Sequence, residues 1–239
     1  MATERGRGAA VGRQLTLNVR LRDEATLDNF LCLPGLEPLL ASMRAIAAGE
    51  GESSLLLHGP ADSGRTHLLQ AACHACRGSA LYLPLHEMKV YPAADVVRDT
   101  QALALVAIDD LQAIAGDRDW EMALFNLFNE ALAGGCRLVF AADGAPSTLG
   151  VALADLRSRL EWGAVFRLPS LSDEEKRAIF EFRAARRGLR LGTETVDYLF
   201  RRAPRDLASL MQLLETLDRA SLTEQRALSV PFVRDALGW

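Results

Sequence analysis

The sequence predicts an α/β protein in which a parallel sheet covered by helices precedes a smaller, all-helical domain. Two observations support the sheet. Apolar runs of strand length alternate with amphipathic runs of helix length as far as Pro169, and a glycine-rich loop, Gly59–Thr66, follows the first apolar run. Beyond Pro169 only helical periods continue, which supports the second domain. With 239 residues, the chain is long enough for one mid-sized and one small domain.

The predicted elements of the α/β domain begin with a helix. Leu36 to Ala48 place their apolar side chains on one helical face, and Gly49 ends the run. The predicted strands cover residues 55–58, 80–83, 102–108 and 137–142, and the predicted helices cover residues 66–76 and about 119–133. The carboxyl ends of parallel strands meet at one edge of the sheet, where ligands of this fold class bind. The loop residues expected at this edge are Gly64, Asp109, Asp110 and Asp143.

The second domain is predicted from helix periods and a strong helix start. Ser172 is a favourable N-cap, and the acidic residues 173–175 suit the first turn of a helix. The expected helices cover about 173–187, 193–202, 205–220 and 230–237. The chain is therefore expected to divide into a flexible N-terminal segment (1–23), an α/β domain (24–169) and a helical domain (170–239).

Composition and charge argue against several classes of function. The net charge of −4 and the pI near 5.6 leave no whole-chain basic field for sequence-specific DNA binding or for an anionic membrane. No apolar run approaches the roughly 20 residues of a membrane span, and the N-terminus lacks the apolar core of a secretory signal, so we expect a cytoplasmic protein. Cys73 and Cys76 resemble half of a metal site, but buried helix thiols are the preferred interpretation because no second pair supplies further ligands.

The Gly59–Thr66 loop has the spacing of a phosphate-binding loop, with Arg65 in place of the usual lysine. In such a loop backbone N–H groups cradle the phosphates, the cation reaches the outer phosphates, and the final hydroxyl holds Mg²⁺. We expect bound ADP or ATP with Mg²⁺. Hydrolysis by the chain itself is left open, because the guanidinium group of arginine is planar and extended, whereas the ammonium group of lysine is compact. A glycine-rich turn without a ligand is the alternative. The residues assigned to the nucleotide are Gly59, Pro60, Ala61, Asp62, Ser63, Gly64, Arg65 and Thr66, with Thr66 also on Mg²⁺.

Two adjacent carboxylates follow the predicted strand at 102–108. Asp109 is placed to engage Mg²⁺, and Asp110 is a possible base that polarises an attacking water. Asp143, after the next predicted strand, is a candidate for sensing the γ-phosphate or positioning water, and a local turn cap is the equal alternative. The upstream phosphate-binding loop favours the functional interpretation of the carboxylate pair.

Several blocks spread along the chain support a family resemblance. They are Gly59–Leu69, Ile108–Leu111, Trp120–Phe125, Asp155–Gly163, Leu171–Glu174 and Leu217–Ser221. Together they resemble the AAA+ ATPases, more closely the bacterial initiator DnaA, and most closely the short DnaA-related Hda proteins, in which arginine also replaces the loop lysine. The resemblance covers Gln14 to Trp239. It implies an AAA+ nucleotide-binding base domain followed by a helical lid domain.

The resemblance also implies roles for single residues. Arg159 matches the family's arginine finger, which projects into a neighbour's ATP site, and Arg205 matches the lid arginine that senses phosphates in its own site. Phe30 matches the segment at the adenine pocket, with plain core packing as the alternative. His67, within the first matched block, is assigned to the nucleotide as well.

A peptide before the α/β domain resembles the segment with which Hda proteins dock into the DNA polymerase sliding clamp (the β subunit). Gln14, Leu15 and Leu17 match that segment and Val19 occupies its end, although Asn18 and Val19 differ from the usual ending. Extended peptides of this kind place alternate apolar side chains in pockets of the partner. Without the family context, an edge strand would be the preferred interpretation of this alternation.

The resemblance implies a nucleotide-bound regulator of replication initiation. Docked on the clamp with ADP in its own site, it would present Arg159 to ATP-bound DnaA and stimulate hydrolysis there. The alternative is an autonomous AAA+ ATPase acting as a loader or remodelling factor, because Asp110 is retained. A DNA-binding initiator is disfavoured, since the chain ends after the lid, and a nucleoside kinase is disfavoured, since no acceptor-site base is evident. Whether the protein is a monomer or a homodimer is left open.

Overall fold

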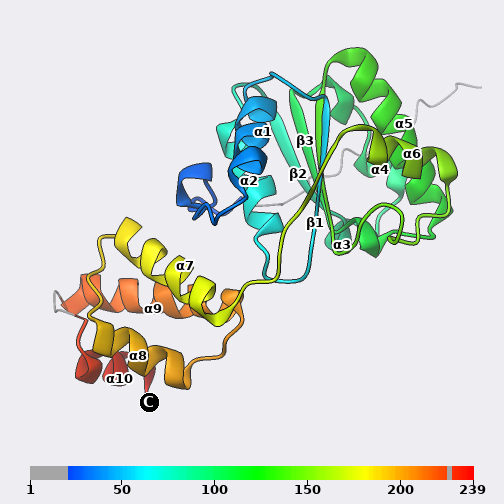
Figure 1. Cartoon of the computed structure of the whole chain (residues 1–239). Coiled ribbons are helices and arrows are strands. Elements are labelled where there is room, and N and C mark those ends of the chain that lie inside the picture. Colours follow the sequence, from blue (N-terminus) through cyan, green and yellow to red (C-terminus); the bar gives the residue numbers. More distant parts are fainter. Residues whose placement is uncertain (1–20, 225–227) are drawn as a thin grey trace, which may run out of the picture.

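The centre of the first domain is a five-stranded sheet in which every neighbouring pair of strands is parallel (Figure 1). The structure is a computed structural model that describes residues 21–224 and 228–239. The strands are β1 (Ser54–His58), β2 (Ala80–Pro84), β3 (Leu105–Asp109), β4 (Arg137–Ala142) and β5 (Ala164–Arg167). Their order is β2-β3-β4-β1-β5, so β1 lies between β4 and β5 and its end leads into the Gly59–Thr66 loop.

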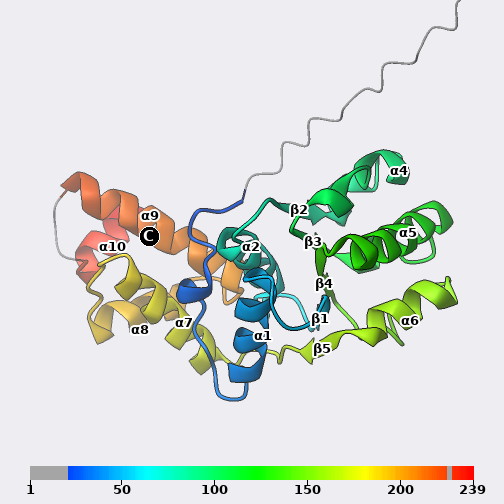
Figure 2. The same cartoon turned by 90° about the horizontal axis from the view of Figure 1, so that it is seen from above.

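Helices cover both faces of the sheet (Figure 2). The longer ones are α1 (Glu37–Ala47), α2 (Arg65–Ala75), α5 (Arg118–Gly134) and α6 (Ala154–Trp162). The short ones are α3 (Leu85–Met88), α4 (Ala93–Val96) and the 3₁₀ turns η1 (Leu27–Asn29), η2 (Thr100–Ala102) and η3 (Leu111–Ala113). Helices α1 and α2 pack on one face, and α5 and α6 pack on the other.

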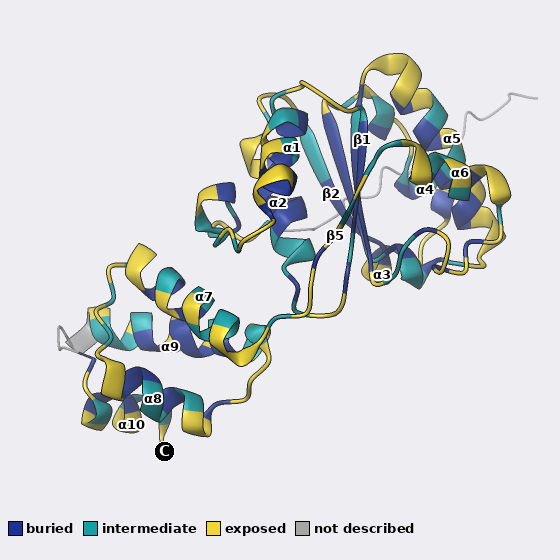
Figure 3. Ribbon diagram, in the orientation of Figure 1, coloured by how far each residue is buried: buried dark blue, intermediate teal, exposed yellow. Residues whose placement is uncertain are grey.

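Alternation along the strands divides the core between these two faces. Leu55 and Leu57 of β1 belong to the core under α1 and α2, while Leu56 belongs to the core under α5 and α6. Successive strand side chains point to opposite faces, so strands covered on both sides read as continuous apolar runs. The dark strands in Figure 3 show this burial.

The second domain consists of α7 (Asp173–Arg186), α8 (Thr193–Arg202), α9 (Leu207–Glu224) and α10 (Val230–Leu237). Helix α7 begins with a capping box, in which the Ser172 hydroxyl accepts from the Glu175 amide at 3.1 Å and the Glu175 carboxylate accepts from the Ser172 amide at 2.7 Å. Phe180 of α7 is fully buried in the core of this domain and meets the ring of Phe200 edge-on.

The predicted fold class is confirmed, but α6 and β5 were not predicted. Helix α6 buries only Leu156 and Leu160, so its sequence lacks a wide apolar stripe. Strand β5 is a four-residue edge strand whose burial alternates, which is too short for a clear period. The third predicted strand begins later than expected, at Leu105, because residues 100–102 form the η2 turn. In the described ranges, 21–224 and 228–239, no helix combines the length and apolarity needed to cross a membrane.

Removal of the Phe180 ring should destabilise the helical domain. Phe180→Ala leaves a cavity in a fully buried position and is expected to lower the free energy of unfolding by about 3–5 kcal/mol. Urea denaturation followed by circular dichroism would measure this loss. Leu222→Ala on α9 is the control, because this side chain is 76% exposed and its truncation should change stability by about 0.5 kcal/mol or less. Equal effects of the two substitutions would contradict the described core.

Candidate functional site

A cavity of about 290 Å³ lies between the sheet domain and the helical domain. One wall is the loop that joins β1 to α2, and a second is the segment of residues 22–36, called here the strap. Helices α7 and α9 close the third side, through Arg183 and Met211 among others. The cavity lies at the carboxyl end of β1, where the fold class predicts a ligand.

The Gly59–Thr66 loop presents the start of α2 to this cavity. Gly64 has a φ of +92° and no side chain to cap α2, so the first-turn amides of the helix are available to an anion. A Cβ at Gly64 would lie 2.9 Å from a ring carbon of Phe30, so any other residue there would have to displace the Phe30 ring. The hydroxyl of Ser63 is buried and has no hydrogen-bond partner in the described part of the chain. These donors fit phosphate oxygens.

Thr66 and Asp109, the two predicted Mg²⁺ ligands, lie in contact. The Thr66 hydroxyl donates to Oδ2 of Asp109 at 2.7 Å, and the hydroxyl of Tyr82 donates to the same oxygen at 2.8 Å. Burial raises the pKa of the Asp109 carboxyl, and it also raises the pKa of Tyr82, which faces that carboxylate. A divalent cation on the Asp109 carboxylate would offset the cost of burying this charge. Tyr82 was not predicted. In the sequence it is one residue of a buried strand, and nothing in that pattern indicates that its hydroxyl contacts a carboxylate of the neighbouring strand.

Asp110 and Asp143 are linked through an amide side chain that was not predicted. Gln112 donates from Nε2 to Oδ1 of Asp110 at 2.9 Å, and its Oε1 accepts from the amide of Asp143 at 3.1 Å. Because β3, β4 and β1 are neighbours, these residues lie along the same edge as the Gly59–Thr66 loop. The arrangement orients the Asp110 carboxylate and joins the ends of β3 and β4.

Arg65 is held by the loop itself. Its Nη1 donates to the carbonyl oxygens of Gly59 and Ala142, at the ends of β1 and β4. The guanidinium therefore stabilises the two strand ends on either side of the loop. Arg65 also lines the cavity, where its positive charge favours an anion.

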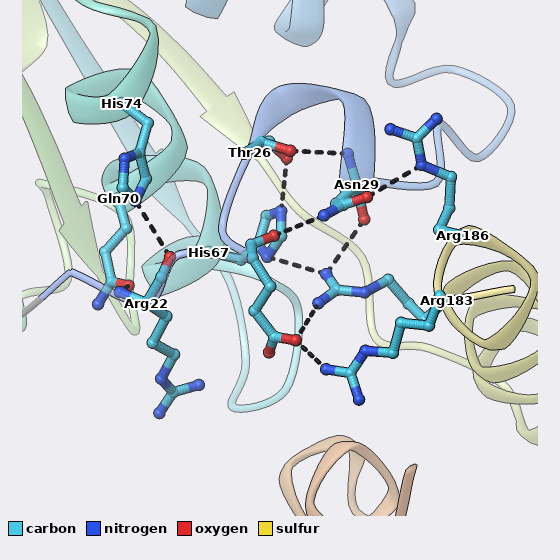
Figure 4. A network of polar contacts seen from close by, with 10 residues as sticks. Arg22, Thr26, Asn29, His67, Gln70, His74, Arg183 and Arg186 are labelled. Carbon is cyan, nitrogen blue, oxygen red and sulfur yellow. Dashed lines mark hydrogen bonds and ion pairs between the residues drawn. The ribbon is translucent and has the colours of Figure 1, made fainter. Parts of the chain in front are cut away.

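His67 joins the start of α2 to both the strap and the helical domain (Figure 4). The Thr26 carbonyl can only accept, so Nε2 carries the proton and donates to it at 2.9 Å. The guanidinium of Arg183 can only donate, so Nδ1 accepts from it at 3.4 Å. The ring is therefore neutral, and burial, with the nearby Arg183 charge, lowers the pKa of His67 to about 4. The ring of Phe30 lies 5.8 Å from the His67 ring.

Three arginines at the end of α7, two in its last turn and one at its C-cap, bind the strap. Arg183, 5% exposed, pairs with Glu24 at 3.0 Å and donates to the carbonyl of Asn29 at 3.2 Å. Arg187 pairs with the same carboxylate, and Arg186 donates to Oδ1 of Asn29 at 3.0 Å. Burial raises the pKa of Glu24, but the two arginines outweigh it, so the net shift is downward. None of these residues was predicted, although arginines spaced three and four apart on one helix were a visible signal.

The remaining predicted residues divide between the cavity and other surfaces. Asp62 lines the cavity and accepts from the amide of Leu207, the first residue of α9, at 3.2 Å. Arg205 is exposed, forms an ion pair with Asp173 at the start of α7, and is not among the residues that line the cavity. The predicted clamp residues Gln14, Leu15, Leu17 and Val19 lie outside the described residues.

Arg159 lies in α6, which covers the opposite face of the sheet from α1 and α2 (Figure 2), and it is not among the residues that line the cavity. Its guanidinium carbon is 5.8 Å from the centre of the Phe128 ring of α5. Trp162, the last residue of α6, also packs edge-on against Phe128 and remains 57% exposed. After Trp162 the chain continues through β5 to Pro169, which lines the cavity. One continuous stretch therefore connects the two surfaces.

Cys73 lies in α2, and Cys76 is the residue that follows its last turn. Burial raises the pKa of the Cys73 thiol to about 12, so it is protonated at neutral pH. Among the residues that the structure describes, no cluster of three or more histidine, cysteine or acidic side chains could hold a metal ion.

A parallel sheet of order 2-3-4-1-5, with a phosphate-binding-type loop after β1 and a helical domain over that loop, defines an AAA+ protein. Residues 21–167 match the family model for the bacterial DnaA ATPase domain, and residues 173–237 match the family model for the Hda lid domain. The chain belongs to the DnaA-related Hda family.

Individual proteins agree with this assignment. An uncharacterised protein of Haemophilus influenzae is 38% identical over 231 residues, which are 95% of this chain and 99% of that protein. Domain III of Thermotoga maritima DnaA superposes with a TM-score of 0.73 at 20% identity, over 92% of this chain and 98% of that one. AMPPCP-bound DnaA from Aquifex aeolicus gives 0.66 at 22% identity, over 85% and 68%. The Thermotoga maritima RuvB branch migration motor gives 0.64 at 16% identity, over 90% and 71%.

His67 should make the stability of the protein depend on pH. Its pKa is about 4 in the folded protein and 6.5 in its ordinary state, so the unfolded chain binds the proton more readily between these values. The histidine's contribution to the free energy of unfolding is therefore complete above pH 6.5 and is lost as the pH falls towards 4. His67→Gln should make the measured slope shallower in this window. Urea denaturation across the window tests this, and an unchanged slope would contradict the neutral, buried imidazole.

Proposed function

We propose that this protein is a nucleotide-bound regulator that, docked on the DNA polymerase sliding clamp, supplies Arg159 to ATP-bound DnaA. Hydrolysis of that ATP would leave DnaA in its ADP form and prevent re-initiation of replication. The observation that supports this most directly is the position of Arg159. It belongs to α6, on the opposite face of the sheet from α2, and it does not line the protein's own cavity, which supports a role at a site on another molecule.

The cavity would hold ADP or ATP with Mg²⁺. The two DnaA structures with bound AMPPCP support an adenine nucleotide as the ligand of this fold. Thr66 and Asp109 would hold the cation, and the first-turn amides of α2 and the Ser63 hydroxyl would donate to phosphate oxygens. Phe30 and His67 would form the wall beside the base. The phosphates of a bound nucleotide would supply the negative charge that complements these hydrogen-bond donors.

The protein's own hydrolysis is proposed to be weak. The guanidinium of Arg65 donates through Nη1 to two carbonyl groups at the base of the loop, so this nitrogen is already engaged within the loop rather than with a phosphate. The assigned sensing residue Arg205 is paired with Asp173 rather than directed at the cavity. ADP is therefore the proposed working ligand, and the cavity acts as a structural switch rather than as a catalytic centre.

Arg159 would act on the partner's ATP. Its guanidinium is always protonated and presents a planar fork of donors that matches phosphate oxygens. When the γ-phosphoryl group is transferred to water, negative charge spreads over its oxygens, and an arginine supplied in trans stabilises this charge. Such an arginine accelerates hydrolysis by about 10³–10⁵ in GTPase systems. Packing on Phe128 keeps the Arg159 side chain in one place before the partner arrives.

The clamp peptide would bring this arginine to its target. The described chain begins at Leu21, next to α2, where the amide of Arg22 donates to Gln70 at 3.1 Å. Residues 14–19 precede this anchor, so a clamp bound there would lie close to the sheet domain.

An autonomous ATPase is the second candidate. The Asp110–Gln112–Asp143 chain supports it, because an oriented carboxylate and a polar group at the end of the next strand are the parts that position an attacking water. Turnover of ATP by the isolated protein at rates typical of AAA+ motors would favour this candidate over the regulator.

Arg159→Ala should abolish the stimulation of DnaA-bound ATP hydrolysis. The expected loss is about 10³-fold or more at saturating regulator, because the partner's γ-phosphate loses its charge stabilisation. A reconstituted assay with radiolabelled ATP on DnaA and DNA-loaded clamp measures this rate. Nucleotide binding by the variant should remain unchanged, since Arg159 does not line the cavity.

Arg118→Ala is the matched control for this substitution. Arg118 is an exposed arginine at the start of α5, and its removal should leave the stimulation intact. Full stimulation by the Arg159→Ala variant would refute the arginine-finger assignment.

Substitutions in the clamp peptide should remove only the clamp-dependent part of the stimulation. The double variant Gln14→Ala/Leu17→Ala loses a polar contact and an apolar anchor, so its affinity for the clamp should fall to an undetectable level. Surface plasmon resonance with immobilised clamp measures the binding. Asn18→Ala serves as control, because this position departs from the family pattern. A stimulation that needs neither the clamp nor Gln14 would contradict this part of the proposal.

A further inference from the structure

Glu121 is a buried carboxylate on α5 that has no role in the cavity. It is 1% exposed, and its two oxygens accept from three backbone amides. Oε1 accepts from Gly116 at 2.7 Å and from Ala152 at 2.9 Å, and Oε2 accepts from Leu153 at 2.7 Å. The carboxylate also lies in the first turn of α5, where the helix dipole favours a negative charge. These contacts explain how an acidic side chain is stabilised at this depth.

Two of the three amides belong to the approach to α6. Leu153 is the N-cap residue of α6, and a leucine side chain cannot accept a hydrogen bond from the helix amides. The Glu121 carboxylate accepts from the amides of Ala152 and Leu153, the two residues that lead into α6. The start of α6 is therefore fixed by a side chain of another helix.

The far end of α6 is held by the same face of α5. Phe128 lies seven residues after Glu121, two helical turns away and on the same side. It contacts both Arg159, at 5.8 Å from guanidinium carbon to ring centre, and Trp162, at 6.4 Å between ring centres. Between these ends Leu156 and Leu160 are buried against the core. Helix α5 thus sets both the start and the end of the helix that bears Arg159.

We propose that Glu121 is a positioning residue for Arg159. Because Glu121 fixes the start of α6, it determines the position of α6 along α5 and therefore the position of the Arg159 side chain. This inference rests on the proposed function of Arg159. It predicts that Glu121 acts on the rate of the partner's hydrolysis and not on the binding of the two proteins, because the side chain itself is buried and does not reach a partner.

The test uses two variants of the full-length protein. Glu121→Gln keeps the length of the side chain, but only the amide oxygen can accept a hydrogen bond. The NH₂ group of the glutamine then faces at least one of the three backbone N–H groups, and two donors meet without an acceptor. Glu121→Asp keeps the charge and is one methylene shorter, so it cannot span the Gly116 amide and the 152–153 pair together. Glu130→Gln is the matched control, because Glu130 is exposed on the same helix. If one Glu121 variant fails to fold, the other supports the test alone.

The stimulation of DnaA-bound ATP hydrolysis is measured against the concentration of each variant. We expect the maximal rate to fall about 10–100-fold, the cost typical of a small misplacement of a catalytic group. The half-saturating concentration and the affinity for nucleotide should stay within about twofold, and Glu130→Gln should match the wild type. Amide hydrogen exchange at residues 152 and 153 should accelerate in the Glu121 variants, while exchange in β1 should not.

Two outcomes would overturn the inference. One is a maximal rate equal to that of the wild type in every Glu121 variant that folds. The other is a parallel loss of nucleotide affinity, which would indicate general disorder rather than misplacement of α6. If the wild-type protein gave no stimulation, the proposed function would fail instead, and amide exchange at 152 and 153 would still report whether Glu121 holds the start of α6.

Discussion

The packing of the helical domain against the sheet domain depends on how one buried guanidinium is neutralised. Arg183 extends from α7 into the interface, and an isolated charge at such a depth would cost several kcal/mol. Glu24, the Asn29 carbonyl and the His67 ring together satisfy it (Figure 4). Because two of these groups belong to the strap, the strap has to lie between α7 and α2. The cavity exists because this one charge draws three segments of the chain to the same place.

Much of the fold, but only part of the site, could be predicted from the sequence. The loop spacing and the apolar runs indicated local structure, since each depends on residues that are close in the chain. The strap network could not be found in this way, because Arg183 and Asn29 are 154 residues apart and no period links them. Gln112 and Tyr82 were missed for a related reason: each is an ordinary polar residue until the order of the strands brings it to Asp143 or Asp109. Helix α6 was missed because it buries only two apolar side chains.

In the proposed function, the sheet separates two chemical tasks by placing them on opposite faces. On one side the amides of α2, the Thr66–Asp109 pair and the strap form a site suited to an anionic ligand. On the other side α5 and α6 present a cation, Arg159, next to exposed apolar surface at Trp162. An arginine that lies away from its own protein's anion site is not neutralised there, and its charge remains available to a second molecule.

The pairing of β5 with β1 has a mechanical consequence. From Leu55 to His58, β1 is in register with β5 from Ala164 to Arg167, and the amide of Leu168 continues the ladder by donating to His58 at 2.7 Å. The chain between the end of α6 and the cavity-lining Pro169 is therefore hydrogen-bonded along β1, the strand that leads into the Gly59–Thr66 loop. A shift of that loop on ligand binding would have to move β5 together with β1 or break this pairing. The strap and the helical domain line the same cavity without pairing to β1, so a ligand could move them and leave the sheet undisturbed.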